Sequence, residues 1–195
     1  SRHLAAFRAR MAGVAARFRH RRNGADSLPS GHMNTSMAAD RQQAKVLTCS
    51  DGVIHGTRDD KSGAALAAHL VMAGFDVVEQ RVTADGTDNV AAALTELTDG
   101  FAGLVVSTGG TGFAPRDQTP EGTRAVIERE APGLAEAMRL CNPLGRLSRG
   151  VAGIRGNAII VNTPGSTKGC VEQLDAILDV LPHALRLLHD TDNSH

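Results

Sequence analysis

Short apolar runs alternate along the chain with stripes of apolar residues that are spaced three or four positions apart. The runs at 45–50 (KVLTCS), 76–83 and 103–108 (GLVVST) each predict a buried strand. The stripes between and after these runs predict helices at 62–74, 87–99, 119–130 and 133–141. This part of the chain is therefore expected to consist of repeated strand–helix units.

The pattern changes in the last quarter of the chain. Two short apolar runs, 150–155 and 157–161, lie on either side of Gly156 and predict a β-hairpin. The turn at 164–166 then begins a long helix, which we expect Pro182 to kink. The apolar stripe of this helix consists of Val171, Leu174, Leu178, Leu181, Leu185 and Leu188.

Together these elements predict an α/β fold. We expect a three-layer αβα domain with a mostly parallel sheet and an antiparallel edge strand or hairpin. We assign residues 45–190 to this domain and residues 191–195 to a tail. Residues 1–44 are predicted to be an N-terminal extension outside the fold, although their first 22 residues have the basic amphipathic pattern of a targeting or membrane-surface helix. Met33 is an alternative start of translation.

Charge and composition narrow the classes of function. The 21 basic and 21 acidic residues cancel, but residues 1–32 hold seven Arg and one Asp, a net charge of +6, which leaves −6 for the rest. With five Phe and no Trp or Tyr, the chain lacks the aromatic platforms of single-stranded nucleic-acid binders. No apolar run has the roughly 20 residues of a membrane span. We therefore expect neither a nucleic-acid nor a membrane partner.

The three cysteines, Cys49, Cys141 and Cys170, are widely spaced in the sequence. An odd number of cysteines without a C-x-x-C pair fits neither a disulfide framework nor a zinc site. This usage indicates a reducing, cytoplasmic setting.

The densest glycine cluster, 107–112 (STGGTG), directly follows the third predicted strand. Ligands of open α/β sheets bind beyond the carboxyl ends of strands, where glycines let backbone N–H groups converge on an anion. A P-loop would need a Lys after Gly112, and a Rossmann fingerprint would follow the first strand, so a dinucleotide dehydrogenase is disfavoured. We predict a phosphate-binding loop, and the simpler alternative is a turn that only reverses the chain.

An aspartate, Asp117, lies five residues beyond this cluster. A carboxylate beside a phosphate would repel it unless a cation lies between them, which suggests Mg²⁺. The alternative is that Asp117 pairs with Arg116 or caps the following helix. The other aspartates that we expect at this end of the sheet are Asp51, Asp59, Asp60 and Asp85.

Two further segments are suited to anions. Ser148 and Arg149 precede the hairpin, and the Pro164-Gly165 turn after it opens a helix whose N-terminus offers free N–H groups. Ser166 and Lys168 would add a hydroxyl and a positive charge there. The alternative is an ordinary helix cap with a solvated lysine.

Taken in order, these motifs resemble the molybdopterin adenylyltransferases, that is, the Mog and MoaB proteins and the related domains of gephyrin and its plant counterpart. The resemblance covers about residues 45–188. It rests on Ser50-Asp51, Asp59–Gly63, Thr108–Gly112, Pro115–Glu121, Leu147–Arg149 and Pro164-Gly165. The chain departs from the family pattern at Gly86, in the short stretch 141–146, and at Ser166-Thr167.

The resemblance implies a molybdopterin-binding fold, usually a homotrimer, that serves molybdenum cofactor biosynthesis. In the implied reaction, ATP and the terminal phosphate of molybdopterin combine, with Mg²⁺, to give adenylylated molybdopterin and pyrophosphate. Asp117 and Asp85 would be catalytic, and Asp60 and Asp117 would bind the metal. The residues expected to bind substrate are Ser50, Asp51, Thr108, Gly109, Gly110, Thr111, Gly112, Thr119, Glu121, Ser148, Arg149, Pro164, Gly165, Ser166 and Lys168.

Elementary electrostatics supports this assignment. The two reacting phosphates repel each other, so cations and backbone donors must neutralise both while holding them in line, and no protein nucleophile is needed. The competing hypothesis is a catalytically silent paralogue that binds molybdopterin as a scaffold. The resemblance also implies hand-over of the product to a molybdate-insertion protein.

Overall fold

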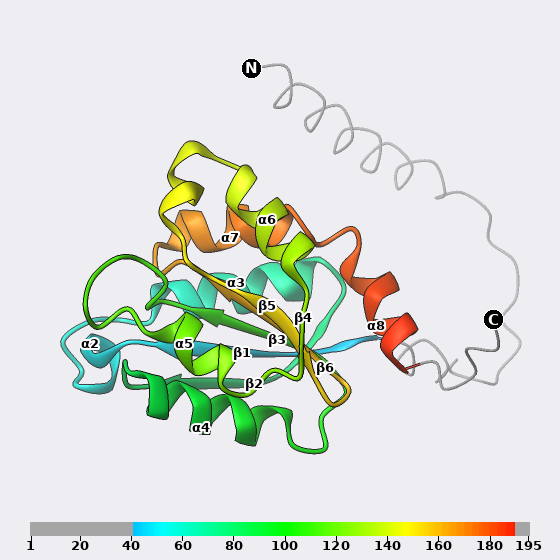
Figure 1. Ribbon diagram of the computed structural model, residues 1–195, viewed down its shortest axis with the longest axis horizontal. Helices are drawn as coiled ribbons and strands as arrows, with labels where there is room; N and C mark the ends of the chain where they lie inside the picture. Colours follow the sequence, from blue (N-terminus) through cyan, green and yellow to red (C-terminus); the bar gives the residue numbers. More distant parts are fainter. Residues whose placement is uncertain (1–40, 190–195) are drawn as a thin grey trace, which may run out of the picture. The chain divides into compact units, whose positions relative to one another are not determined.

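The computed structural model describes residues 41–189 of the 195-residue chain (Figure 1). The predictions for the basic N-terminal segment and for the tail at 191–195 lie outside the described residues. Within the described part, no helix is long and apolar enough to cross a membrane.

The core of the fold is one six-stranded sheet with the order β2-β1-β3-β6-β5-β4. β1 pairs in parallel with β2 and β3, and β3 pairs in parallel with β6, whereas β5 is antiparallel to both β6 and β4. This arrangement confirms the mostly parallel sheet with an antiparallel hairpin at one edge. The strands are β1 (Gln43–Cys49), β2 (Asp76–Thr83), β3 (Gly103–Thr108), β4 (Arg129–Glu130), β5 (Ala152–Arg155) and β6 (Ala158–Thr163).

Helices cover both faces of this sheet, as the ribbon drawing shows (Figure 1). α3, α6, α7 and α8 pack on one face, and α4 and α5 on the other. A short helix, α2, and a 3-10 helix, η2, complete the described elements. Their bounds are α2 (Asp51–Ile54), α3 (Lys61–Met72), α4 (Thr87–Thr98), α5 (Thr119–Arg124), α6 (Pro132–Leu140), η2 (Pro143–Leu147), α7 (Thr167–Asp175) and α8 (Leu181–His189).

Two apolar clusters separate the layers. Because side chains alternate along a strand, Val46 of β1 lies in the cluster under α3 and α7, while its neighbour Leu47 lies in the cluster under α4. The central strand β3 behaves in the same way, and all six of its residues are buried. Burial on both faces explains why the apolar residues Leu104–Val106 follow one another in this strand instead of alternating with polar ones.

The predicted helix at 119–130 is too long. α5 ends at Arg124, and Arg129–Glu130 form the short edge strand β4. The backbone N–H of Glu128 donates to Ile154 O at 2.8 Å, and that of Ala131 donates to Ala152 O at 2.8 Å. Pairing with β5, which is distant in sequence, therefore overrides the local helical pattern.

The predicted long helix after residue 166 is also two helices. α7 and α8 are separated by a stretch of turns at 176–180, so Pro182 lies in the first turn of α8 and does not kink a continuous helix. Proline suits a first turn because its missing N–H would have no partner there. The apolar stripe still faces the core, where Leu174, Leu181 and Leu185 are fully buried.

Candidate functional site

A cavity of about 950 Å³ lies at the carboxyl ends of β1, β3 and β6. Strand order reverses direction between β1 and β3, which is where ligands of open α/β sheets bind. Loops after these strands form one side of the wall, and α3, η2 and α7 contribute the other. The predicted site residues that line the cavity are Ser50, Asp85, Thr108, Gly109, Gly110, Thr111, Gly112, Asp117, Ser148, Pro164, Gly165, Ser166 and Lys168.

The glycine loop after β3 packs against its surroundings too closely for side chains. Gly109 and Gly110 have positive φ angles of 98° and 61°. A Cβ on Gly109 would lie 2.3 Å from Cys49 O, and one on Gly110 would lie 2.3 Å from the Thr119 hydroxyl. Only glycine fits such backbone angles at such distances. These contacts explain why glycine is required at both positions, and the phosphate-binding role of the loop stays a prediction.

Among the backbone N–H groups of this loop, that of Gly109 has an acceptor in the described part of the chain and the next three do not. The Gly109 N–H donates to Thr163 O at 3.2 Å, and so it extends the pairing of β3 with β6. No acceptor among residues 41–189 receives the N–H groups of Gly110, Thr111 or Gly112. All three residues line the cavity, so their unbonded N–H groups are candidate donors to an anion.

The loops after β1 and β2 are joined by a reciprocal pair of aspartates. The Asp51 N–H donates to Asp85 Oδ2 at 3.0 Å, and the Asp85 N–H donates to Asp51 Oδ1 at 3.1 Å. The second carboxylate oxygen of Asp51 lies 2.5 Å from the Arg116 guanidinium. Asp51 is thus fully engaged and does not line the cavity, whereas Asp85 lies in its wall next to Gly110.

Asp117 occupies the wall on the other side of the glycine loop. Its Oδ2 accepts the Ala114 N–H at 2.9 Å, which closes a turn in the exposed segment between them. A Cβ on Gly112 would lie 2.8 Å from the same oxygen, so the absence of a side chain there lets the carboxylate approach. Asp117 does not pair with Arg116, because Arg116 binds Asp51.

Asp60, predicted to bind metal, has a structural role. Its Oδ1 accepts the Gly63 N–H at 2.8 Å and caps α3, and its Oδ2 accepts the Thr48 hydroxyl at 2.8 Å. Both oxygens are engaged, and Asp60 is not in the cavity wall. Residues 41–189 contain no group of three His, Cys, Asp or Glu side chains that could hold a metal. The predicted gathering of all the loop aspartates around Asp117 is therefore wrong.

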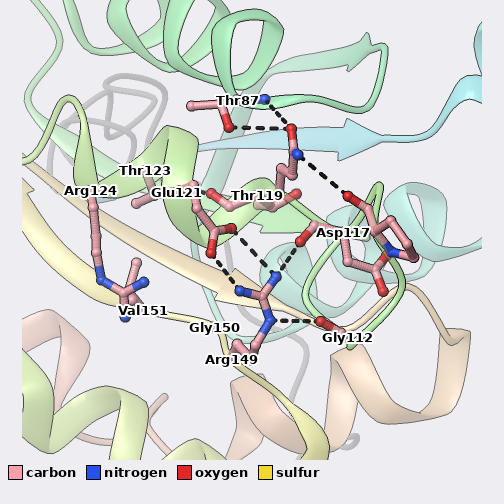
Figure 2. A network of polar contacts seen from close by, with 12 residues as sticks. Thr87, Gly112, Asp117, Thr119, Glu121, Thr123, Arg124, Arg149, Gly150 and Val151 are labelled. Atoms are coloured by element: carbon pink, nitrogen blue, oxygen red, sulfur yellow. Dashed lines mark hydrogen bonds and ion pairs between the residues drawn. The ribbon is translucent and has the colours of Figure 1, made fainter.

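Three other predicted ligands, Thr119, Glu121 and Arg149, lie behind the wall and not in it. Arg149 donates from Nε to Gly112 O at 2.7 Å and from Nη1 to Glu121 Oε1 at 2.5 Å, and its Nη2 donates to Asp117 O (Figure 2). Partial burial alone would raise the pKa of Glu121, but hydrogen bonding and the charge of Arg149 lower it below the ordinary value. The buried Thr119 hydroxyl has no partner among the described residues.

Several wall residues were not among the predicted site residues, although Lys61, Ser62 and Leu147 lie within motifs on which the family resemblance rests. Arg58, Lys61 and Ser62 surround the N-terminus of α3, and Leu144 and Leu147 of η2 form an apolar part of the opposite side. The lysine and serine directly follow the Asp60 cap, so the capping pattern is the signal that marks them. The leucines carry no chemical signature, because an exposed leucine in a short helix is not distinctive.

One buried thiol also borders the cavity. Burial raises the pKa of Cys49 to about 12, and the nearby Thr119 hydroxyl only partly opposes this rise. At neutral pH the thiol is therefore protonated and is a poor nucleophile. This agrees with a reaction that needs no nucleophile from the protein.

Known proteins are similar in sequence to this domain. A family model described as "Probable molybdopterin binding domain" matches residues 45–183. The chain is 37% identical to the molybdopterin adenylyltransferase of Helicobacter pylori (strain J99) over 150 residues, which cover 73% of this chain and 85% of that protein. It is 31% identical over 190 residues to gephyrin of Dictyostelium discoideum, which is 89% of this chain but 26% of gephyrin.

Solved structures give the same result. The molybdopterin biosynthesis enzyme MoaB of Thermus thermophilus is 43% identical and superposes with a TM-score of 0.71, covering 75% of this chain and 96% of that one. The Mog protein of Mycobacterium ulcerans is 38% identical with a TM-score of 0.70, covering 75% and 99%. The family match, the sequence identities and the shared fold together show that the chain belongs to the molybdopterin-binding domain family.

Proposed function

We propose that the protein transfers the adenylyl group of ATP to the terminal phosphate of molybdopterin and releases pyrophosphate. The observation that carries this proposal is the set of free N–H groups of Gly110, Thr111 and Gly112 between two wall carboxylates, Asp85 and Asp117. Relatives that carry the name molybdopterin adenylyltransferase support it, among them the Helicobacter pylori and Escherichia coli proteins at 37% and 39% identity.

The free donors suit the phosphate that reacts. Three backbone N–H groups bind phosphate oxygens without the flexibility of a lysine, and they are fixed before the substrate arrives. Ser166 caps α7 through its bond from the Gly169 N–H at 3.2 Å, and residues 166–169 line the cavity, so the partial positive charge at the N-terminus of this helix lies in the wall. Two anionic groups can therefore be held in one cavity and be aligned for in-line transfer.

The charge of the wall indicates why a divalent cation is needed. Three cationic side chains line the cavity, those of Arg58, Lys61 and Lys168. They are outnumbered by four carboxylates, those of Asp59, Asp85, Asp117 and Glu172. Such a wall does not neutralise ATP and a molybdopterin phosphate on its own.

The donor set fits Mg²⁺. Asp85 and Asp117 each use Oδ2 to accept a backbone N–H, while Oδ1 of each has no hydrogen-bond partner among the described residues. Magnesium is commonly held by one or two carboxylates, with substrate phosphates completing its coordination. We propose that these two residues hold it and that it would neutralise phosphate charge there. Asp60 suits this role less well, because each of its oxygens accepts a hydrogen bond and the residue does not line the cavity.

In this proposal the chain's own residues bind and orient the substrates. The glycine loop would hold the molybdopterin phosphate or the adenylate linkage, and Ser148, Pro164 and Gly165 would line the pterin side. The apolar side chains of Leu144 and Leu147 offer contact area to a flat ring, since the chain has no Trp or Tyr for stacking. Homotrimer assembly and hand-over to a molybdate-insertion protein belong to the same proposal and rest on the family resemblance, and a cytoplasmic location rests on the cysteine usage.

The deciding experiment is pyrophosphate release from ATP by the purified chain, with and without molybdopterin and Mg²⁺. We expect release only when all are present, and a loss of at least about 100-fold in Asp117→Asn and Asp85→Asn. Molybdopterin binding should be largely kept in both variants. A chain that binds molybdopterin but releases no pyrophosphate with any divalent cation would instead be the scaffold paralogue.

A further inference from the structure

The guanidinium of Arg149 binds both ends of the loop that carries Asp117. Its Nε donates to Gly112 O at 2.7 Å, and its Nη2 donates to Asp117 O, so two carbonyls five residues apart share one planar group. The backbone N–H of Arg149 also donates to Thr111 O at 2.8 Å. Arg149 thus contacts the glycine loop and the loop of Asp117 at the same time (Figure 2).

Few other bonds tie this loop to the rest of the fold: the Thr119 N–H donates to Gly110 O at 3.0 Å across its base, and Gln118 bonds to Thr87. Residues 113–116 are exposed, and Phe113 in particular is 70% exposed. The ion pair of Arg116 with Asp51 involves a guanidinium that is 72% exposed, and pairs of this kind contribute little in water. The Arg149 side chain is 35% exposed, so its bonds are better protected from solvent than that surface pair.

Glu121 fixes the guanidinium itself. Its carboxylate oxygens accept hydrogen bonds from Arg149 Nη1 at 2.5 Å and Nη2 at 3.4 Å. The guanidinium edge that does not face the loop is therefore bound to α5. Glu121 lies in the first turn of this helix, which suits a carboxylate. Arg149 is therefore held from the helix and in turn holds the loop.

A second tie connects this loop to the one that carries Asp85. The side-chain oxygen of Gln118 accepts from the Thr87 N–H at 3.2 Å and from the Thr87 hydroxyl at 3.3 Å. Its amide nitrogen donates to Pro115 O at 3.3 Å. Thr87 begins α4, two residues after Asp85, so the two wall carboxylates are placed by one connected set of bonds.

We propose that Arg149, anchored by Glu121, is a positioning residue that places Asp117 and the Gly112 end of the phosphate loop for adenylyl transfer. This inference rests on the proposed function. It assigns Arg149 and Glu121 to the support of the loop, and it does not place them in contact with substrate. Lysine cannot replace Arg149, because a single ammonium does not present the planar fork that serves two carbonyls and a carboxylate.

The test compares Arg149→Lys and Glu121→Gln with Arg155→Lys. Arg155 is a matched control, since it also binds a backbone carbonyl, Val126 O at 3.2 Å, and a side chain, the Thr98 hydroxyl at 3.0 Å, but does not line the cavity. We expect Arg149→Lys to lower kcat for pyrophosphate release at least about 10-fold while KM for ATP stays within about threefold. Glu121→Gln should lower kcat less, and Arg155→Lys should leave it unchanged.

A second measurement reports the stability of the loop independently of catalysis. Amide hydrogen exchange of residues 112–118 in the unliganded chain should speed up at least about 10-fold in Arg149→Lys and not in Arg155→Lys. If Arg149→Lys does not fold, Glu121→Gln serves for both measurements, because it keeps the arginine and the shape of its partner. Unchanged exchange in 112–118 together with an unchanged kcat overturns the proposal.

The two proposals can fail separately. If the wild-type chain releases no pyrophosphate, the proposed function is wrong, while the exchange measurement still decides whether Arg149 holds the loop. If the wild type is active and Arg149→Lys loses affinity for ATP with kcat unchanged, Arg149 binds substrate and the positioning role is overturned.

Discussion

Replacing Gly112 by alanine tests how closely activity depends on the placement of the Asp117 carboxylate. The backbone of Gly112 does not have a positive φ, so alanine is compatible with its conformation. The new Cβ would lie 2.8 Å from Asp117 Oδ2, and reaching an ordinary contact of 3.4 Å requires a shift of about 0.6 Å. The strain is therefore confined to the end of one side chain.

The expected effect is on turnover. A misplacement of about 1 Å in an active site costs roughly 100-fold, so a shift of about 0.6 Å should lower kcat roughly 10-fold. Stability should fall by only about 1 kcal/mol, the typical contribution of the hydrogen bond from the Ala114 N–H that the shift disturbs. Pyrophosphate release at saturating ATP and molybdopterin measures the first quantity, and urea unfolding measures the second.

Gly133→Ala is the matched control. It makes the same chemical change in α6, where a Cβ would meet no atom within 4 Å. We expect unchanged turnover and a gain in stability of about 0.5 kcal/mol, because alanine is the better helix former. The reasoning is refuted if Gly112→Ala keeps a kcat within about twofold of Gly133→Ala, since the position of Asp117 would then not matter to the transfer.

Three further predictions concern residues near the cavity. Asp60→Ala should lower the free energy of unfolding by about 1–2 kcal/mol, because the α3 cap is lost. The Mg²⁺ concentration for half-maximal activity should stay unchanged. A shift in that concentration would instead indicate that Asp60 is a metal ligand. Because the fold lowers the pKa of Glu121 below its ordinary value of 4.5, ionised Glu121 stabilises the protein above that value. Its advantage over Glu121→Gln in urea unfolding should therefore be present at neutral pH and shrink as the pH falls below 4.5. At pH of about 8, iodoacetamide should label the exposed Cys141 and leave the buried Cys49 unlabelled until the chain is unfolded. Mass spectrometry of the labelled chain measures both sites. Labelling of Cys49 in the folded chain would contradict its raised pKa.

The sequence predicts the sheet well because its signals are local. The run at 103–108 has three consecutive apolar residues, Leu104–Val106, since both faces of β3 are covered, and its predicted bounds are those of the strand. The segment at 125–130 could not be assigned in this way. Its extended backbone depends on pairing with β5, which lies more than twenty residues away, and no local pattern reports that pairing.

The same distinction separates the predicted site residues that line the cavity from those that do not. Gly109–Gly112 are contiguous and directly follow a strand, so topology alone carries them to the cavity. Arg149 and Asp60 are polar residues in suitable loops, but the direction in which each side chain points is decided by partners that are remote or geometrically specific. Sequence motifs identified the neighbourhood of these residues and not their contacts.

The ion pair between Arg116 and Asp51 gives ionic strength a second route to the activity of this protein. Through it and the reciprocal aspartates, the loops after β1, β2 and β3 form a rim that is closed by side chains rather than by continuous backbone. The exposed pair is weakened by salt over the same range that screens the attraction of polyanionic substrates. A salt titration of turnover therefore reports mainly substrate attraction, and comparison with an Arg116→Gln variant, which lacks the pair but keeps the Gln118–Thr87 bonds, isolates the small part that comes from the rim.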